Sequence, residues 1–170
     1  EFNLCWGHRL KREKVWLVAL GISQTFSQSC SRNTWILAKS YWRTSLLLFT
    51  IMLMVFTGHG KGKTTAAIGQ VVRALGGGRR AAFYQFIKSD SYPAGEDIFL
   101  RAVARDYGEV FVFEKGGKGF VGILGDKLPK EEHEKAALET FDKCKEAVFS
   151  GRFDLVVFDE INVAVSLELV

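Results

Sequence analysis

The sequence predicts an α/β fold, in which helices cover both faces of a doubly wound, mainly parallel sheet. Three observations support this. Apolar runs of strand length alternate with helical stretches, as in parallel sheets. One such run breaks into a glycine- and lysine-rich loop that opens a helix, and the last apolar run ends in two carboxylates. Because parallel strands end at one edge of their sheet, we expect a ligand site there.

The elements are justified in chain order. The second half of the apolar run 45–56 is expected to be a buried strand, and the helix that follows, 63–75, ends at three glycines, residues 76–78. A continuous apolar run predicts a strand over 81–87, covered on both faces. Further on, the sequence predicts a helix over 96–106 after a turn at Pro93, a strand over 109–113, a helix over 130–150 with Pro129 and acidic residues at its start, and a strand over 153–158.

Length and charge limit the function. A chain of 170 residues fits one domain of ordinary size. The net charge of +4 is uneven, because residues 1–53 hold seven basic and two acidic residues, and the remainder holds 16 and 17. The later part is therefore not a basic nucleic-acid surface, and we expect no nucleic-acid partner. The cysteines, Cys5, Cys30 and Cys144, are too scattered for a disulfide framework or a zinc cluster, which favours a reducing cytoplasm.

The first 51 residues differ in composition from the rest. They contain all four tryptophans and no aspartate or methionine, whereas the two methionines are Met52 and Met54. Our hypothesis is that residues 1–51 are an extension of upstream or vector origin, and that 52–170 form the nucleotide-binding domain. A membrane anchor is a rival interpretation, but the apolar run 45–56 is short of the ~20 residues needed to span a bilayer. An amphipathic N-terminal helix that packs over the active site is a third.

The segment 55–67, VFTGHGKGKTTAA, has the pattern of a phosphate-binding loop. Its glycines allow successive backbone N–H groups to point inward, towards a polyphosphate at the positive end of the next helix: Gly58, Gly60 and Gly62. Lys63 adds a positive charge, and Thr64 offers a hydroxyl to a magnesium ion. His59 lies within the loop, with its side chain expected to point outward. The alternative is a glycine turn with a solvated lysine, but strand, loop and helix together favour nucleotide binding. The loop is one residue short of the standard pattern, because Thr57 stands where a glycine is required.

The run LVVFDE, 155–160, fits the second half of a nucleotide site. A buried strand would present Asp159 and Glu160 at its tip, beside a Mg²⁺ ion that takes few protein ligands. Taken alone, this pattern could also be a turn or a helix cap. The phosphate-binding loop upstream favours the functional interpretation.

The other motifs in the sequence give weaker evidence for a function. The glycines at 117, 119 and 122 satisfy GxGxxG, but no helix is expected to open there, so a flexible loop near a substrate is favoured over a dinucleotide site. Neither His8 nor His133 has metal-ligand spacing with His59, and His133 is expected on a solvated helix face. No general base is evident. Either an unseen group activates water or a hydroxyl, or the substrate is itself the nucleophile.

Taken together, the chain resembles the ATP:corrinoid adenosyltransferases of the P-loop type, also called cob(I)alamin adenosyltransferases. The shared motifs cover most of residues 54–162, in the family's order: FTGHGKGKTTAA (56–67), RALGGG (73–78), YQFIKS (84–89), PAGE (93–96), GGKGF (116–120) and LVVFDEIN (155–162). The resemblance implies a P-loop NTPase-like fold. It also implies transfer of the 5′-deoxyadenosyl group of ATP to a cob(I) corrinoid, with release of triphosphate. Cobalt(I) would be the nucleophile, so no catalytic acid or base is required.

The resemblance also implies roles for particular residues. Those that bind the triphosphate would be Gly58, His59, Gly60, Lys61, Gly62, Lys63, Thr64 and Thr65. Thr64 and Glu160 would hold Mg²⁺ or Mn²⁺ with Asp159 in support, and Phe120 would lie near the lower face of the corrinoid. The expected partners are the two small-molecule substrates, an electron-donor protein and, in a complete protein, a second copy in a homodimer. No membrane partner is expected.

Two departures from the family pattern and two other functions stay open. Gly122 stands where many members carry an aromatic residue, and the chain stops at Val170, whereas members continue through a further strand and a Thr-Gly-Arg segment. The domain 52–170 is therefore expected to be incomplete at its C-terminus. The alternatives to the transferase are a generic P-loop kinase or ATPase, and a non-catalytic fragment that binds ATP.

Overall fold

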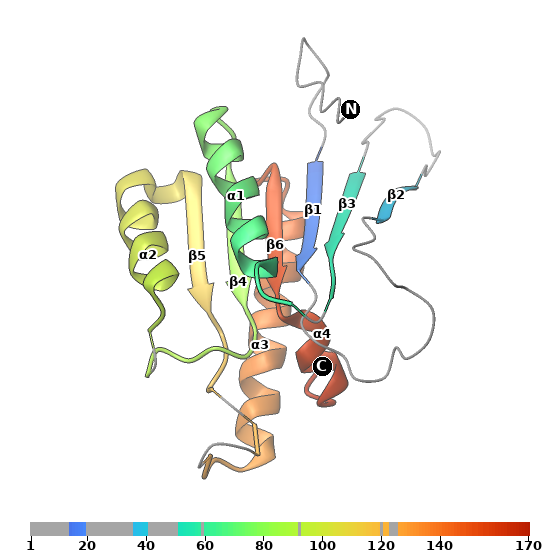
Figure 1. Ribbon diagram of the computed structural model, residues 1–170, viewed down its shortest axis with the longest axis vertical. Coiled ribbons are helices and arrows are strands. Elements are labelled where there is room, and N and C mark those ends of the chain that lie inside the picture. The colour runs from blue at the N-terminus through green and yellow to red at the C-terminus, as the bar shows by residue number, and fades with distance from the viewer. Residues whose placement is uncertain are drawn as a thin grey trace.

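The structure is a computed structural model of the chain, and it describes residues 14–19, 36–40, 51–58, 60–91, 93–119, 121–122 and 126–170. Two predicted site residues, His59 and Phe120, lie outside these described ranges. Figure 1 shows one sheet with helices packed against it.

The sheet contains six strands in the order β2-β3-β1-β6-β4-β5. Their bounds are β1 Lys14–Ala19, β2 Ile36–Ser40, β3 Ile51–Phe56, β4 Ala81–Gln85, β5 Phe111–Lys115 and β6 Leu155–Asp159. Neighbouring strands pair in parallel, except that β2 is antiparallel to β3. The register puts the last residues of the five parallel strands in one row, in the order Phe56, Ala19, Asp159, Gln85 and Lys115. The parallel strands therefore end at a common edge, as the predicted fold class requires.

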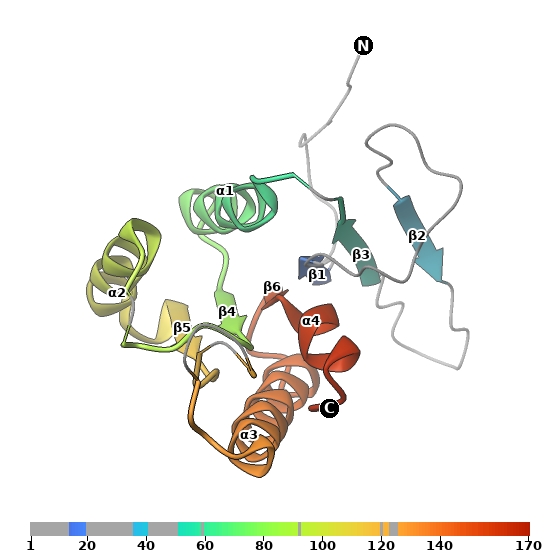
Figure 2. The ribbon, with the colours of Figure 1, turned by 60° about the horizontal axis from the view of Figure 1, so that its bottom comes forward.

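Helices cover both faces of this sheet. Their bounds are α1 Lys63–Gly76, α2 Gly95–Tyr107, α3 Lys130–Phe149 and α4 Ile161–Ser166, and a short 3₁₀ turn, Gly108–Val110, precedes β5. Figure 2 shows α1 and α2 on one face and α3 and α4 on the other. This arrangement confirms the prediction of an α/β fold with a mainly parallel sheet and helices on both faces.

Helix α1 shows how the sequence directs this packing. Ala67, Val71 and Leu75 recur every four residues, so they share one face of the helix, and all three are buried. The helix ends where Gly78 adopts a φ of +70°, a conformation that glycine tolerates best. Its buried face thereby fixes the direction in which the N-terminal end of the helix points.

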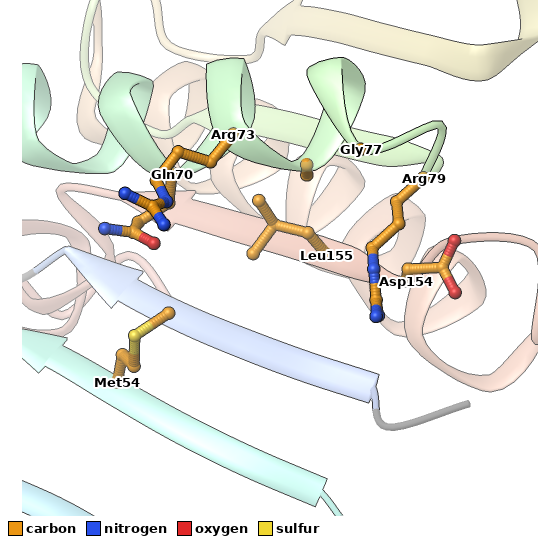
Figure 3. Close-up of a pocket in the computed structure, with 8 residues that line it drawn as sticks. Met54, Gln70, Arg73, Gly77, Arg79, Asp154 and Leu155 are labelled. Carbon is orange, nitrogen blue, oxygen red and sulfur yellow. The ribbon is translucent and has the colours of Figure 1, made fainter. Parts of the chain in front are cut away.

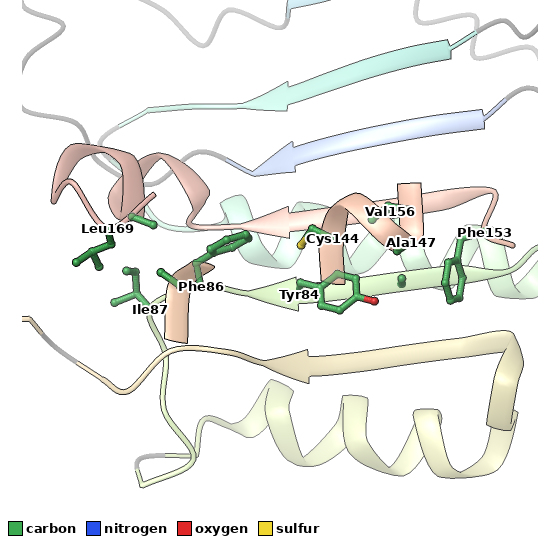
Figure 4. Packing of buried hydrophobic residues seen from close by; sticks show 11 residues of the cluster. Tyr84, Phe86, Ile87, Cys144, Ala147, Phe153, Val156 and Leu169 are labelled. Atoms are coloured by element: carbon green, nitrogen blue, oxygen red, sulfur yellow. The ribbon is translucent and has the colours of Figure 1, made fainter. Parts of the chain in front are cut away.

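The sheet separates two hydrophobic clusters. One lies beneath α1 and α2 and is centred on Phe83, Leu100 and Phe111. The other, shown in Figure 4, lies beneath α3 and α4 and includes Tyr84, Phe86 and Cys144. Cys144 is fully buried in this second cluster.

Most of the predicted elements are confirmed. Strand β5 begins two residues later than expected, because the 3₁₀ turn takes up residues 108–110. Helix α4 and strands β1 and β2 were not predicted. Two strands of the sheet come from residues 1–51, and the upstream or vector origin of that segment stays a prediction. In the part of the chain that the structure describes, no helix combines the length and the apolar character needed to cross a bilayer.

The buried face of α2 gives the first testable prediction. Leu100 is 1% exposed against β5, whereas Leu138 on α3 is 51% exposed. We expect Leu100→Ala to lower the free energy of unfolding by about 2–5 kcal/mol, because it removes buried methyl groups and leaves a cavity. Leu138→Ala is the matched control and should change it by less than about 0.5 kcal/mol. Urea unfolding measures both, and equal effects would contradict the described packing.

Candidate active site at the carboxyl edge of the sheet

The predicted phosphate-binding loop connects β3 to α1 at the carboxyl edge. Gly58 and Gly62 have φ values of +139° and +103°, which residues other than glycine rarely adopt. The Nζ of Lys63 donates hydrogen bonds to the carbonyl oxygens of Gly58 (2.8 Å) and Gly60 (2.6 Å). The lysine thus holds the loop in a tight curve. Lys61 and Thr65 are exposed at the same end of α1.

The first turn of α1 suits an anion. Among the residues described, no side chain caps this helix, and its first turn contains no acidic residue. The first N–H groups of a helix have no partner within the helix and lie at the positive end of its dipole. Successive N–H groups at 63–65 therefore form the kind of site that binds phosphate.

The Thr64 side chain connects this loop to β6. Its hydroxyl donates to both carboxylate oxygens of Asp159, at 3.1 Å and 3.3 Å. Strand β1 separates β3 from β6, so the contact spans two strand spacings, about 9–10 Å. The start of α1 provides the reach, because it lies over the edge of the sheet. The structure therefore brings the two predicted halves of the site together.

Asp159 is almost completely buried, with 1% of the residue exposed. The Nε2 of Gln85 donates to its Oδ2 at 2.9 Å. Burial raises the pKa of Asp159, whereas the hydrogen bonds from Gln85 and Thr64 and the charge of Lys88 act in the opposite direction. Asp159 is thus a carboxylate held in place by partners on two other elements.

Glu160 follows directly and has an uncommon backbone conformation. Its φ is +64°, in the left-handed region, and its backbone caps the short helix α4. Burial and the neighbouring charge of Asp159 raise the pKa of Glu160, and Lys88 and Lys63 oppose them. Strain of this kind concentrates at functional sites.

These side chains form an oxygen-rich set that could hold a hard divalent cation. Thr64 offers a hydroxyl, and Asp159 and Glu160 offer carboxylates, which are the ligands that Mg²⁺ accepts. The described residues contain no cluster of three or more His, Cys, Asp or Glu side chains with metal-binding geometry. A cation at this site would therefore complete its coordination with phosphate oxygens and water.

The loop after β5 lies against the end of β4. Gly116 N donates to Gln85 O (2.8 Å), and Gly119 N donates to Ile87 O (3.0 Å). A Cβ on Gly117 would lie 2.1 Å from the backbone of Ile87, so only glycine fits there. The first part of the predicted flexible loop is therefore bound to the sheet edge. No helix opens at these glycines, since α3 begins at Lys130, and this agrees with the rejection of the dinucleotide motif.

The prediction that His133 lies on a solvated helix face is wrong. His133 is 3% exposed, and its Nε2 lies 3.0 Å from Oδ2 of Asp126. The backbone N–H groups of Gly122 and Leu128 also donate to Asp126, at 2.9 Å and 3.1 Å. The segment before α3 folds back over the first turn of that helix and covers the imidazole. This contact between Asp126 and His133 closes the end of the loop that begins at Gly116.

Sequence reasoning missed several residues of this edge. Gln85 lies within an apolar run and within the shared motif YQFIKS (84–89), but neither pattern gives it a role in the site. Lys115 and Asp97 form a buried ion pair at 2.6 Å between the end of β5 and the first turn of α2, with each side chain 1% exposed. Lys88 and Glu96 form a second ion pair, with 3.6 Å between Nζ and Oε1. These pairs fix the start of α2 beside the loop after β5.

A cavity of about 200 Å³ lies elsewhere, between the second half of α1 and the sheet. Figure 3 shows Arg73 and Arg79 towards opposite ends of it, with Leu155 of β6 between them and Met54 of β3 below. Leu155 is the first residue of β6 and Asp159 is the last. The cavity is therefore nearer the amino edge of the sheet and is distinct from the candidate site.

A phosphate-binding loop between β3 and α1, connected to a carboxylate at the end of the parallel strand β6, defines an α/β protein of the P-loop class. Residues 50–170 match the family described as ATP:corrinoid adenosyltransferase BtuR/CobO/CobP, and the chain belongs to this family. The resemblance predicted from the sequence is thereby confirmed.

Curated relatives agree with this family. The corrinoid adenosyltransferase of Escherichia coli K12 is 32% identical over 117 residues, which is 69% of this chain and 55% of that protein. Those of Pseudomonas aeruginosa and a Sinorhizobium species are 33% and 29% identical, over 66% and 70% of this chain and 52% of each relative. The chain thus spans about half the length of the curated relatives it matches.

The contact between Asp126 and His133 predicts an acid-sensitive stability. Hydrogen bonds from the N–H groups of Gly122 and Leu128 hold the pKa of Asp126 below its ordinary value of 3.8. An acid with a lowered folded-state pKa stabilises the fold above its unfolded pKa and loses that contribution as the pH falls through the folded pKa. The difference in unfolding free energy between the parent chain and Asp126→Asn should therefore narrow between about pH 5 and pH 2. Asp142→Asn, at an exposed pair with Lys145, should show no such narrowing.

The backbone of Glu160 gives a prediction that separates stability from function. We expect Glu160→Gly to raise the free energy of unfolding by about 1 kcal/mol, because glycine relieves the left-handed strain, and to weaken MgATP binding. Glu168 also has a positive φ, +56°, with 87% of its side chain exposed, so Glu168→Gly is the matched control. It should stabilise the chain without changing nucleotide binding. Urea unfolding and calorimetric titration check both, and destabilisation by Glu160→Gly would contradict the argument.

Proposed function

We propose that the chain transfers the 5′-deoxyadenosyl group of ATP to the cobalt of a cob(I) corrinoid and releases triphosphate. The main support is the contact between Thr64 and Asp159, which joins a phosphate-binding loop to an acidic strand end in a member of this family. This reaction would serve the biosynthesis or salvage of adenosylcobalamin. Family membership favours it over a generic kinase or ATPase.

The chemistry places few demands on acid–base groups. The electron pair of cobalt(I) forms the bond to C5′, and the C5′–O5′ bond breaks, with its electrons leaving on the triphosphate. The protein must bind the leaving group and hold C5′ in line with the cobalt. No proton has to move in this step, so an acid or base residue is not required.

We assign binding of the triphosphate to the loop and the first turn of α1. The backbone N–H groups would contact its oxygens, and Lys63 would offset the negative charge that grows on the leaving group. We include His59 because it belongs to the loop. Thr64 and Glu160 would hold Mg²⁺ or Mn²⁺, with Asp159 in support, and the ion would neutralise the phosphate oxygens.

The corrinoid is assigned to the loop that begins at Gly116. This loop lies against the end of β4, at the same edge as the phosphate-binding loop. Phe120 is our candidate for the contact with the lower face of the corrinoid. A homodimer and an electron-donor protein that generates cob(I) complete the proposal, and the cytoplasmic location favoured by the scattered cysteines stays a prediction.

The function is tested by anaerobic incubation of the chain with MgATP and chemically reduced cob(I)alamin. We expect adenosylcobalamin and triphosphate in equal amounts, followed by the corrinoid spectrum and by chromatography of the phosphate product. Lys63→Ala should lower the rate by about 100-fold or more, because it removes a charge that stabilises the leaving group. Lys145→Ala, on the exposed face of α3, is the control.

Other products would decide between the alternatives. Release of ADP or orthophosphate in place of triphosphate would identify a kinase or ATPase. Binding of MgATP with no product would identify a nucleotide-binding chain without catalytic activity.

A further inference from the structure

Gln85 is a polar side chain in a place where the core would accept an apolar one. It is the last residue of β4, within the apolar run AAFYQFI, and it is completely buried. Burying an amide is unfavourable unless both its donor and its acceptor find partners. The position therefore calls for an explanation from the contacts that the amide makes.

One end of the amide is accounted for. The Nε2 of Gln85 donates to Oδ2 of Asp159 at 2.9 Å. A carboxylate only accepts hydrogen bonds, so this contact fixes the orientation of the amide, with its NH₂ group towards Asp159. The backbone carbonyl of Gln85 is also occupied, because it accepts from Gly116 N at 2.8 Å.

The other end of the amide finds no hydrogen-bond partner in the part of the chain that the structure describes. Among the described residues, the Oε1 of Gln85 is buried and accepts no hydrogen bond. Leaving a buried acceptor unpaired costs free energy, because the hydrogen bond that it made to water in the unfolded chain is not replaced. Methionine has nearly the same size and would avoid this cost. The amide oxygen is thus available to a donor that arrives with a ligand.

The surroundings define the chemistry of that donor. Gln85 and Asp159 are adjacent in the row of strand ends, and Thr64 contacts the same carboxylate. Thr64 and Asp159 are among the residues to which we assign a divalent cation. Mg²⁺ usually keeps several of its water molecules when it binds to protein. Cation-bound water donates hydrogen bonds strongly, which matches an acceptor with no other partner.

We infer that Gln85 is a positioning residue for the cation. It orients the carboxylate of Asp159 through Nε2 and accepts a hydrogen bond from a cation-bound water through Oε1. This inference rests on the proposed function, because it requires the cation site at Thr64, Asp159 and Glu160. Groups that orient the ligands of a metal typically change its affinity by about 10- to 100-fold when they are mutated.

The test uses Mn²⁺ as the probe, with the full chain and ATP. Gln85→Met removes the hydrogen bond to Asp159 and the proposed hydrogen bond to the cation-bound water, and it keeps the volume. Gln70→Met on α1 is the matched control. We expect Gln85→Met to weaken Mn²⁺ binding by about 10-fold or more, measured by electron paramagnetic resonance. ATP binding in the presence of EDTA should not change. The cation-free Gln85→Met chain should unfold more easily, because the buried carboxylate of Asp159 loses a donor, so Mn²⁺ binding is compared under conditions in which circular dichroism shows both chains to be folded.

Each other outcome overturns the inference. Unchanged Mn²⁺ affinity would show that Gln85 does not act on the cation. A Gln85→Met chain that binds ATP more weakly in EDTA would show a general structural role. Thr64→Ala separates this result from the proposed function. If Thr64→Ala loses Mn²⁺ and Gln85→Met does not, only the role of Gln85 fails. If Thr64→Ala also binds Mn²⁺ like the parent chain, the cation site itself fails.

Discussion

The burial of Asp159 is the constraint on which the candidate site depends. A carboxylate with 1% exposure needs hydrogen-bond donors, and it finds them in Thr64 at the start of α1 and Gln85 at the end of β4. One acidic side chain thus connects three elements that are distant in the sequence. Because β1 lies between β3 and β6, the connection runs over the sheet edge through α1 and not between adjacent strands. The position of the phosphate-binding loop and the position of the acidic pair are therefore set by the same contacts.

Local patterns in the sequence were sufficient for the elements whose signals lie within a few residues. The run from β3 through the glycine loop into α1 was predicted because the apolar run, the glycines and the helical spacing are contiguous. The strand ending at Asp159 was predicted for the same reason. The parallel register then follows from alternating strands and helices, and it brings Thr64 and Asp159 together. This part of the fold and of the site can therefore be predicted from short, contiguous segments of the sequence.

The remainder depends on contacts between distant residues. Gln85 belongs to the shared motif YQFIKS, but its contact could not be predicted, because nothing in these residues indicates which side chain will meet a buried carboxylate. His133 was misplaced because the helical pattern does not tell that the preceding segment folds back to put Asp126 on its imidazole. The ion pair between Lys115 and Asp97 joins two elements by side chains that sequence alone would place in solvent. The position and register of β1 between β3 and β6 likewise depend on tertiary contacts, which local sequence does not specify.

The acidic end of β6 is unfavourable in itself, and this fits a site that is completed by a ligand. Two adjacent carboxylates are both partly or wholly buried, burial raises the pKa of each, and Glu160 adds backbone strain. Lys63 and Lys88 offset only part of this, since the pKa values stay raised. A cation bound here would replace repulsion between Asp159 and Glu160 with attraction to both. The free energy stored in the carboxylates would then contribute to cation binding, and the fold, which keeps Asp159 in place through Thr64 and Gln85, maintains that state before the ligand arrives.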